Sequence, residues 1–173
     1  LFGDGAGAVI VEPSHSESGI LATKLHSEGA FADKLWTVRP SSNDFPRIKK
    51  GEMVADETFF PQMDGRFVFK HAVTRMCESL HEVCADQKVS VKDIDFVLAH
   101  QANLRINMMV LEQLGISPEK TLNTLQKYGN TTAATLPIGL EEALAQDMIK
   151  PGMLVAMVAF GSGFTWGASL MRW

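Results

Sequence analysis

The amino-acid sequence predicts an α/β protein with a mixed sheet and helices packed on it. Short apolar segments that suit strands alternate with longer segments in which apolar residues recur every three or four positions, as on one face of a helix. The last two strand-like segments are separated only by the short turn GSG, which indicates an antiparallel hairpin at the end of the chain. With 173 residues, of which 46% are hydrophobic and 21% charged, the chain suits one globular domain.

In the first half of the chain, strands are expected at residues 8–11 and 20–25. Only a short polar turn joins them, so they should be antiparallel neighbours. Residues 29–62 contain several prolines and no regular pattern, and a stretch of this length is expected to be functional or partly helical. A helix is predicted at residues 65–85, where apolar side chains recur at helical spacing.

In the second half, strands and helices alternate up to the closing hairpin. Gly115 follows the first of these helices and is placed to end it in a left-handed conformation. The expected elements are, in order, a strand at 94–99, a helix at 102–114, an extended stretch at 121–125, a helix that ends near residue 149, and strands at 153–160 and 165–173.

Composition and charge exclude several classes of protein. No apolar run approaches the roughly 20 residues that span a bilayer, and no signal peptide opens the chain. The net charge of −4 disfavours a general nucleic-acid binder. Cys77 and Cys84 lie within the predicted helix at a spacing that suits neither a zinc site nor a disulfide framework. We therefore expect a cytoplasmic protein with two reduced, buried thiols, no metal, and neither membrane nor nucleic acid as partner.

The start of the chain has an unusual composition. It reads LFGDGAGAVIVEP, without an initiating methionine and with turn glycines among its first residues. A natural N-terminus is more often polar and frayed. Residues 1–18 are therefore interpreted as the terminal strand of a preceding, missing half, and residues 19–173 as a C-terminal half.

Polar residues follow three of the predicted elements, at the edge where ligands bind in open α/β sheets. His100 directly follows a buried strand, Asn130 opens the next helix, and Ser162 lies between two glycines at the end of another strand. Each also has a structural explanation, because His100 can leave the core and cap a turn, Asn130 can cap a helix, and the glycines can form a tight hairpin. Together they supply an imidazole, an amide and a backbone N–H, which can bind a carbonyl oxygen as it becomes negative. This set lacks a nucleophile.

Five segments closely resemble one known family. They are FGDGAGAVIV, AHQANLRI, YGNTTAATLP, IKPG and AFGSGFTWGASLMRW, and they occur in the same order as in the C-terminal half of β-ketoacyl-acyl carrier protein synthase III. The resemblance implies a thiolase-like fold of two similar halves with a layered αβαβα core. It also implies an acyltransferase of fatty acid synthesis initiation, which condenses a short acyl-coenzyme A with malonyl-acyl carrier protein by decarboxylation. The resemblance further implies a homodimer, with a coenzyme A thioester as substrate and no cofactor.

The resemblance also implies roles for individual residues. His100 and Asn130 match the family's histidine and asparagine in a Cys-His-Asn triad and would donate hydrogen bonds to the malonyl thioester oxygen; the cysteine would belong to the missing half. The N–H of Ser162, where the family usually has glycine, matches a second oxyanion hole. The expected substrate-binding residues are Met63, Gly65, Phe69 and Asn103, and the expected carrier-protein patch is Arg66, Lys70 and Arg105. A structural role for Asn103 and simple solvent exposure of the charged residues remain open alternatives.

Two other functions remain open. The chain could be part of a non-catalytic thiolase-fold subunit, or of a related condensing enzyme of secondary metabolism. A cysteine at the nucleophile position upstream of Leu1 would favour catalysis, and serine or glutamine there would favour the non-catalytic subunit. We expect residues 1–173 alone to be inactive and to risk exposing apolar surface such as Phe67, Val155 or Leu170.

Overall fold

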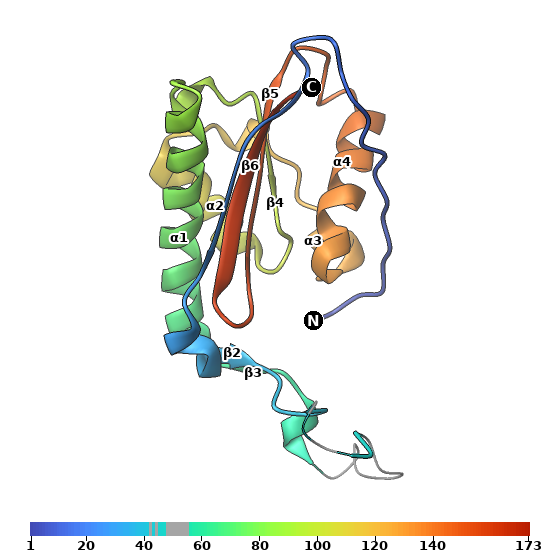
Figure 1. Ribbon diagram of the computed structural model, residues 1–173, viewed down its shortest axis with the longest axis vertical. Coiled ribbons are helices and arrows are strands. Elements are labelled where there is room, and N and C mark those ends of the chain that lie inside the picture. The colour runs from blue at the N-terminus through green and yellow to red at the C-terminus, as the bar shows by residue number, and fades with distance from the viewer. Residues whose placement is uncertain (42, 44, 48–55) are drawn as a thin grey trace.

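A four-stranded mixed sheet forms the centre of the molecule, with strand order β1-β6-β5-β4. The computed structural model describes residues 1–41, 43, 45–47 and 56–173. The antiparallel pairs are β1 (Gly19–Ser27) with β6 (Thr165–Arg172) and β6 with β5 (Leu154–Gly161), while β5 runs parallel to β4 (Phe96–Ala99). Helices lie on both faces of this sheet (Figure 1). The predicted mixed sheet and its closing hairpin are confirmed.

Helices α1 (Gly65–Asp86) and α2 (Leu104–Leu114) cover one face of the sheet. The carboxylate of Asp64 caps α1 by accepting a hydrogen bond from the N–H of Phe67. On the inner side of α1, Leu80 and Val83 are fully buried in one cluster with strand residues such as Leu170. The helical periodicity read from the sequence therefore marks the face that packs on the sheet.

Helix α4 (Thr135–Ala145) covers part of the opposite face. There Phe96 and Leu98 of β4 pack against Leu140 and Ala143 of the helix. Their neighbour Val97 points to the α1 side, as the two-residue period of a strand requires. The described residues also form three short elements: β2 (Leu35–Trp36), β3 (Gln62–Met63) and α3 (Leu125–Tyr128).

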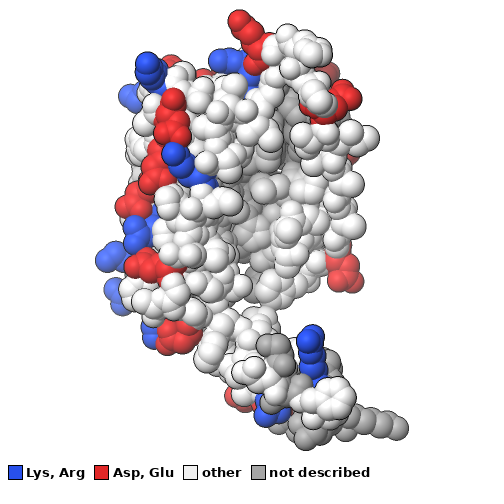
Figure 2. All heavy atoms as spheres, in the orientation of Figure 1, with Lys and Arg blue, Asp and Glu red and all other residues white. Residues whose placement is uncertain are grey.

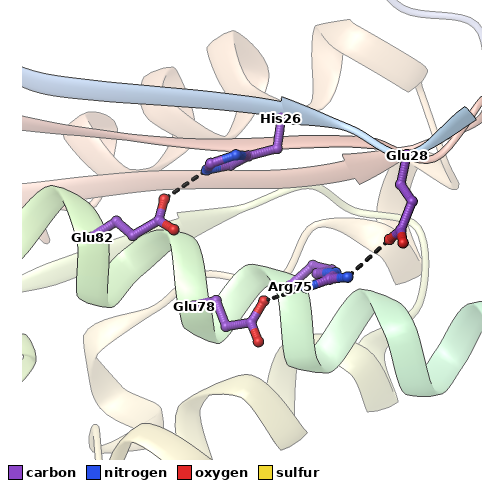
Figure 3. Close-up of polar contacts among 5 residues, drawn as sticks. All are labelled: His26, Glu28, Arg75, Glu78 and Glu82. Atoms are coloured by element: carbon purple, nitrogen blue, oxygen red, sulfur yellow. Dashed lines mark hydrogen bonds and ion pairs between the residues drawn. The ribbon is translucent and has the colours of Figure 1, made fainter.

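A row of charged and polar side chains joins α1 to the strand β1 and to Glu28, which follows it (Figure 3). Arg75 reaches Glu28 at 2.8 Å and Glu78 at 2.9 Å, and His26 Nε2 lies 2.6 Å from Glu82. These side chains are about a third to a half exposed, so each pair contributes at most about 1 kcal/mol. Their contribution is to fix where the helix sits along the strand, over a core held by apolar burial.

The expected strand at residues 8–11 is wrong. These residues are exposed and form no ladder, and the antiparallel neighbour of β1 is β6. Their apolar alternation suits a strand, but a strand also needs a partner for its backbone N–H and C=O groups, and no other described strand lies beside them. Residues 1–18 instead run along α4 without regular structure, apart from one bridge between Phe2 and Asn130 (Figure 1).

Three further expectations are corrected in detail. The extended stretch at residues 121–125 reduces to one bridge between Thr121 and Val97, because Leu125 already begins α3. The helix expected to end near residue 149 ends at Ala145. Val155 and Leu170 are not at risk of exposure, since helices cover both faces of the sheet and both side chains are fully buried.

The irregular stretch expected at residues 29–62 is partly helical where it is described. It contains a 3-10 turn at Gly29–Lys34 and another at Glu57–Phe59. Residues 42, 44 and 48–55 of this stretch lie outside the described residues. Within the described part of the chain, no helix is both long and apolar enough to cross a membrane.

Candidate active site

His100 directly follows the carboxyl end of β4, which positions it. Its backbone N–H donates a hydrogen bond to the carbonyl oxygen of Val158 on β5, at 2.8 Å, which extends the parallel pairing by one residue. On the side chain, Nδ1 lies 2.8 Å from the hydroxyl oxygen of Thr135, the first residue of α4. Burial lowers the pKa of the imidazole below its ordinary value of 6.5, because the charged form loses solvation. The ring is therefore neutral at pH 7.

Gln101 ties this strand end to the segment that leads to Asn130. The side chain is 2% exposed, and its Nε2 donates to the carbonyl oxygens of Ala99 at 2.9 Å and Leu122 at 3.3 Å. Its Oε1 accepts a hydrogen bond from the N–H of Thr124 at 3.0 Å. Its position directly after a buried strand is the signal by which the sequence could have identified Gln101 as a residue of the site.

Asn130 is held by its own side chain and by the start of the chain. Its Oδ1 accepts a hydrogen bond from the N–H of Thr132 at 2.8 Å, as in a cap. Its backbone N–H donates to the carbonyl oxygen of Leu1 at 3.1 Å, and its carbonyl oxygen accepts from Gly3 at 3.0 Å. Among the described residues, nothing accepts a hydrogen bond from the side-chain nitrogen, so this NH₂ group remains as a donor for a ligand.

The glycines of the N-terminal segment permit this close packing. A Cβ on Gly3 would lie 1.9 Å from the carbonyl oxygen of Tyr128, and one on Gly7 would lie 2.4 Å from Pro137. Gly129, just before Asn130, has a φ of 70° and also lies against Leu1. The segment GDGAGA is therefore a packing element that positions the asparagine.

A chain of hydrogen bonds joins His100 to Asn130. Thr135 Oγ1 contacts His100 on one side and donates to the carbonyl oxygen of Thr132 at 2.9 Å on the other, and Thr132 N–H reaches Asn130. The structure thus brings two of the predicted site residues into one group. Nothing in the sequence indicated that Thr135 belongs to the site, because threonine is a common residue at the start of a helix.

Ser162 lies at the tip of the hairpin between β5 and β6 and is exposed. Because β4 and β5 are parallel, its segment and His100 follow strand ends on the same edge of the sheet. The tip is held by Gly163, whose N–H donates to the carbonyl oxygen of Leu35, and by Phe164, which is fully buried.

The other predicted residues lie around the first turns of α1 and α2. Met63 and Gly65 are exposed and Phe69 is partly buried. The guanidinium of Arg105 lies over the ring of Phe69, 5.7 Å from its centroid, so the two helix starts meet there. The side-chain oxygen of Asn103 accepts from the N–H of Arg105 and caps α2, which is the structural role left open for it.

Arg66 and Lys70 are exposed on α1, one helical turn apart and therefore on the same face of the helix. Neither makes an ion pair with another described residue. Arg105, at the start of α2, is the one of the three predicted basic residues that the structure places over the ring of Phe69.

Neither cysteine of the chain is suited to act as a nucleophile. Cys77 and Cys84 are 8% and 1% exposed on the inner face of α1. Burial raises the pKa of the Cys77 thiol to about 11 and also raises that of Cys84. At neutral pH both are thiols, whereas the reactive form of cysteine is the thiolate.

The fold and the grouped His100 and Asn130 define a thiolase-like protein. The family model for the C-terminal domain of 3-oxoacyl-[acyl-carrier-protein] synthase III matches residues 84–173, and the model for 3-oxoacyl-[acyl-carrier-protein] synthase III matches residues 1–29. The chain belongs to the 3-oxoacyl-[acyl-carrier-protein] synthase III family.

Individual relatives agree with this assignment. A beta-ketoacyl-[acyl-carrier-protein] synthase III of Oleidesulfovibrio alaskensis is 44% identical over 99% of this chain and 52% of its own length. The crystal structure of the synthase III from Aquifex aeolicus superposes with a TM-score of 0.79 at 38% identity, over 93% of this chain and 46% of that one. The Thermus thermophilus structure gives 0.81 at 30% identity, over 94% and 49%. The chain spans about half the length of the curated relatives it matches.

Proposed function

We propose that this chain is the C-terminal half of an acyltransferase that initiates fatty acid synthesis. The reaction is the decarboxylative Claisen condensation of a short acyl-coenzyme A with malonyl-acyl carrier protein. The observation that carries the proposal is the hydrogen-bonded group of His100 and Asn130, in which the asparagine keeps a free amide donor and is linked through Thr132 and Thr135 to a neutral imidazole. Donors arranged in this way stabilise an oxygen on which negative charge develops.

In this mechanism, a short acyl group first passes from coenzyme A to a cysteine that the missing half supplies. The malonyl group then loses carbon dioxide, and the resulting carbanion attacks the acyl thioester. Asn130 Nδ2 and His100 Nε2 are the donors to the malonyl thioester oxygen, where enolate charge develops. Removing one such donor typically costs about 3–4 kcal/mol of transition-state stabilisation. The N–H of Ser162, with that of the cysteine, is assigned to the oxyanion hole for the acyl carbonyl.

Substrate delivery is assigned to the starts of α1 and α2. We assign Met63, Gly65 and Phe69 to the tunnel for the pantetheine arm and the acyl group. We assign Arg66, Lys70 and Arg105 to the patch for the acidic carrier protein, because they are three exposed positive charges at the starts of α1 and α2. Since the side-chain oxygen of Asn103 caps α2, we assign the substrate contact of this residue to its amide nitrogen.

The full protein is proposed to work in the cytoplasm as a homodimer, with no metal or bound cofactor. A non-catalytic subunit would keep the same fold and pair with an active partner. A condensing enzyme of secondary metabolism would keep the chemistry and change the acyl substrate. One assay of condensation distinguishes both alternatives from the proposed function.

The test uses the full-length protein with acetyl-coenzyme A and malonyl-acyl carrier protein. Release of carbon dioxide and formation of the β-ketoacyl product are measured together, and the residue upstream of Leu1 in the nucleophile position is read from the gene. Condensation with a cysteine at that position supports the proposal. Condensation only with other acyl groups would favour secondary metabolism, and absence of turnover with serine or glutamine would favour the non-catalytic subunit.

A further inference from the structure

Thr135 is the residue in direct contact with the buried nitrogen of His100. It is 2% exposed at the start of α4. Its Oγ1 lies 2.8 Å from His100 Nδ1 and 2.9 Å from the carbonyl oxygen of Thr132. The hydroxyl therefore has two hydrogen-bond partners, and it carries only one hydrogen to share between them.

The chemistry of the two partners decides where that hydrogen lies. A carbonyl oxygen can only accept, so the contact with Thr132 requires the hydroxyl hydrogen. Oγ1 is then an acceptor toward His100, and Nδ1 must carry a proton to donate. A neutral imidazole has one N–H, so Nε2 is left with a lone pair.

We propose that Thr135 is a positioning residue that sets the tautomer of His100, with the resting proton on Nδ1 and Nε2 as an acceptor. The same bond fixes the plane of the ring, because Nδ1 is tethered to the start of α4. A ring that donates from Nε2 is reached when the hydroxyl turns its hydrogen from Thr132 to Nδ1, which gives up the bond to the carbonyl oxygen. The consequence for the reaction rests on the proposed function, in which His100 donates from Nε2.

This arrangement makes the donating form the minority form. The donating form lacks one hydrogen bond that the resting form has. A hydrogen bond of ordinary net strength makes the donating form roughly fivefold less populated than the resting form. A protein that reacts only from a minority form loses rate in that proportion. Removing the hydroxyl therefore has an unusual expected effect: it should favour the donating form.

The first test measures the tautomer directly. The ring nitrogens of His100 are observed by 15N NMR in the full-length protein at neutral pH and assigned by their loss in His100→Gln. Nδ1 should be protonated and Nε2 unprotonated in the wild type and in Thr135→Ser, which keeps the hydroxyl. In Thr135→Val, which keeps the shape, the proton should move to Nε2, because a buried Nδ1–H would have no acceptor. A wild-type ring protonated on Nε2, or a valine variant with the wild-type pattern, would overturn the proposal.

The second test separates this inference from the proposed function. Decarboxylation of malonyl-acyl carrier protein should rise by up to roughly fivefold in Thr135→Val and stay unchanged in Thr135→Ser. A shifted tautomer without any change in decarboxylation would refute the donor role of His100 and leave the role of Thr135 intact. Should Thr135→Val not fold, the wild-type and serine spectra still decide where the resting proton lies.

Discussion

At the scale of single residues, His100 and Asn130 each use one polar atom to hold their position and leave another for a ligand. His100 uses Nδ1 toward Thr135, and Asn130 uses Oδ1 toward the N–H of Thr132. The atoms left over, Nε2 and Nδ2, are the ones to which we assign a role in the reaction. This division explains why a capping interpretation and a catalytic interpretation of Asn130 do not exclude each other.

Replacing His100 by alanine in the full-length protein should impair decarboxylation more than acyl transfer to the cysteine. Loss of the donor should slow decarboxylation by about 100- to 1000-fold. The two partial reactions are measured separately, with release of carbon dioxide for one and labelling of the protein by acetyl-coenzyme A for the other. His81→Ala, at an exposed position of α1, is the matched control. Loss of transfer with normal decarboxylation would contradict the assigned role.

The lowered pKa of His100 should make folding stability depend on pH. The pKa of a histidine in the unfolded chain is near 6.5, and that of folded His100 lies below it. As the pH falls through 6.5 the unfolded state binds the proton first, so the free energy of unfolding decreases until the folded pKa is passed. The Tm of the wild type should therefore fall more between pH 7.5 and 5.5 than the Tm of His100→Gln. Equal losses in both proteins would show that His100 titrates normally, and His81→Gln serves as the control.

At the scale of elements, the order of strands and helix starts assembles the site. The parallel pairing of β4 and β5 puts His100 and the hairpin tip at one edge, and α2 begins at its cap Asn103 just after His100. The start of α2 then meets α1 at the contact between Arg105 and Phe69. The residues assigned to substrate delivery therefore lie close to His100, because α2 begins only a few residues after it.

Reversing the charge of Arg105 should weaken binding of the carrier protein. Arg105→Glu should raise the KM for malonyl-acyl carrier protein several-fold, while acyl transfer from coenzyme A stays near normal. Added salt should raise the wild-type KM as well, since exposed charges are screened over about 10 Å at 0.1 M. Lys92→Glu, beside Gly115 beyond the other end of α2, is the control for a general charge effect. If both half-reactions decline equally, the arginine acts by packing on Phe69.

At the scale of the whole molecule, several large apolar side chains are exposed to solvent. Val9, Ile10 and Val11 are 62%, 94% and 77% exposed, and Leu25 on the edge strand is 80% exposed. On the face shown in Figure 2, charged side chains gather along α1, whereas the surface between α1 and the N-terminal segment is largely uncharged. Exposed apolar surface of this kind is typical of interaction sites and of segments prone to aggregation.

Residues 1–173 alone should be inactive and should self-associate. The two donors stabilise charge but cannot hold an acyl group, which needs an activated thiolate, and the thiols of Cys77 and Cys84 are buried. Expression of this segment followed by light scattering and the condensation assay tests both points. Turnover by a monomeric preparation would show that a nucleophile lies within these residues, and alkylation of the native protein would then identify it.

The sequence alone predicted α1 well and residues 8–11 wrongly, and the two cases differ in where their hydrogen bonds lie. A helix satisfies its backbone groups within itself, so the spacing of apolar residues such as Leu80 and Val83 is enough to predict it. A strand depends on a partner elsewhere in the chain, and local composition at residues 8–11 says nothing about whether that partner exists. The resemblance to a family was equally local, since it rested on short segments such as AHQANLRI.

The sequence by itself determined the class of fold and the family, and it singled out His100 and Asn130 as candidate site residues. What only the tertiary structure decided is how these two are joined: Thr135 reaches a histidine 35 positions away, and Gln101 reaches the backbone of Thr124 across 23 positions. Such contacts depend on how β4 and α4 pack in space, and a side chain's partner cannot be read from its own position in the sequence. Our proposal for the proton on His100 rests on the same kind of contact, because Thr135 has only one hydrogen to share between His100 and Thr132.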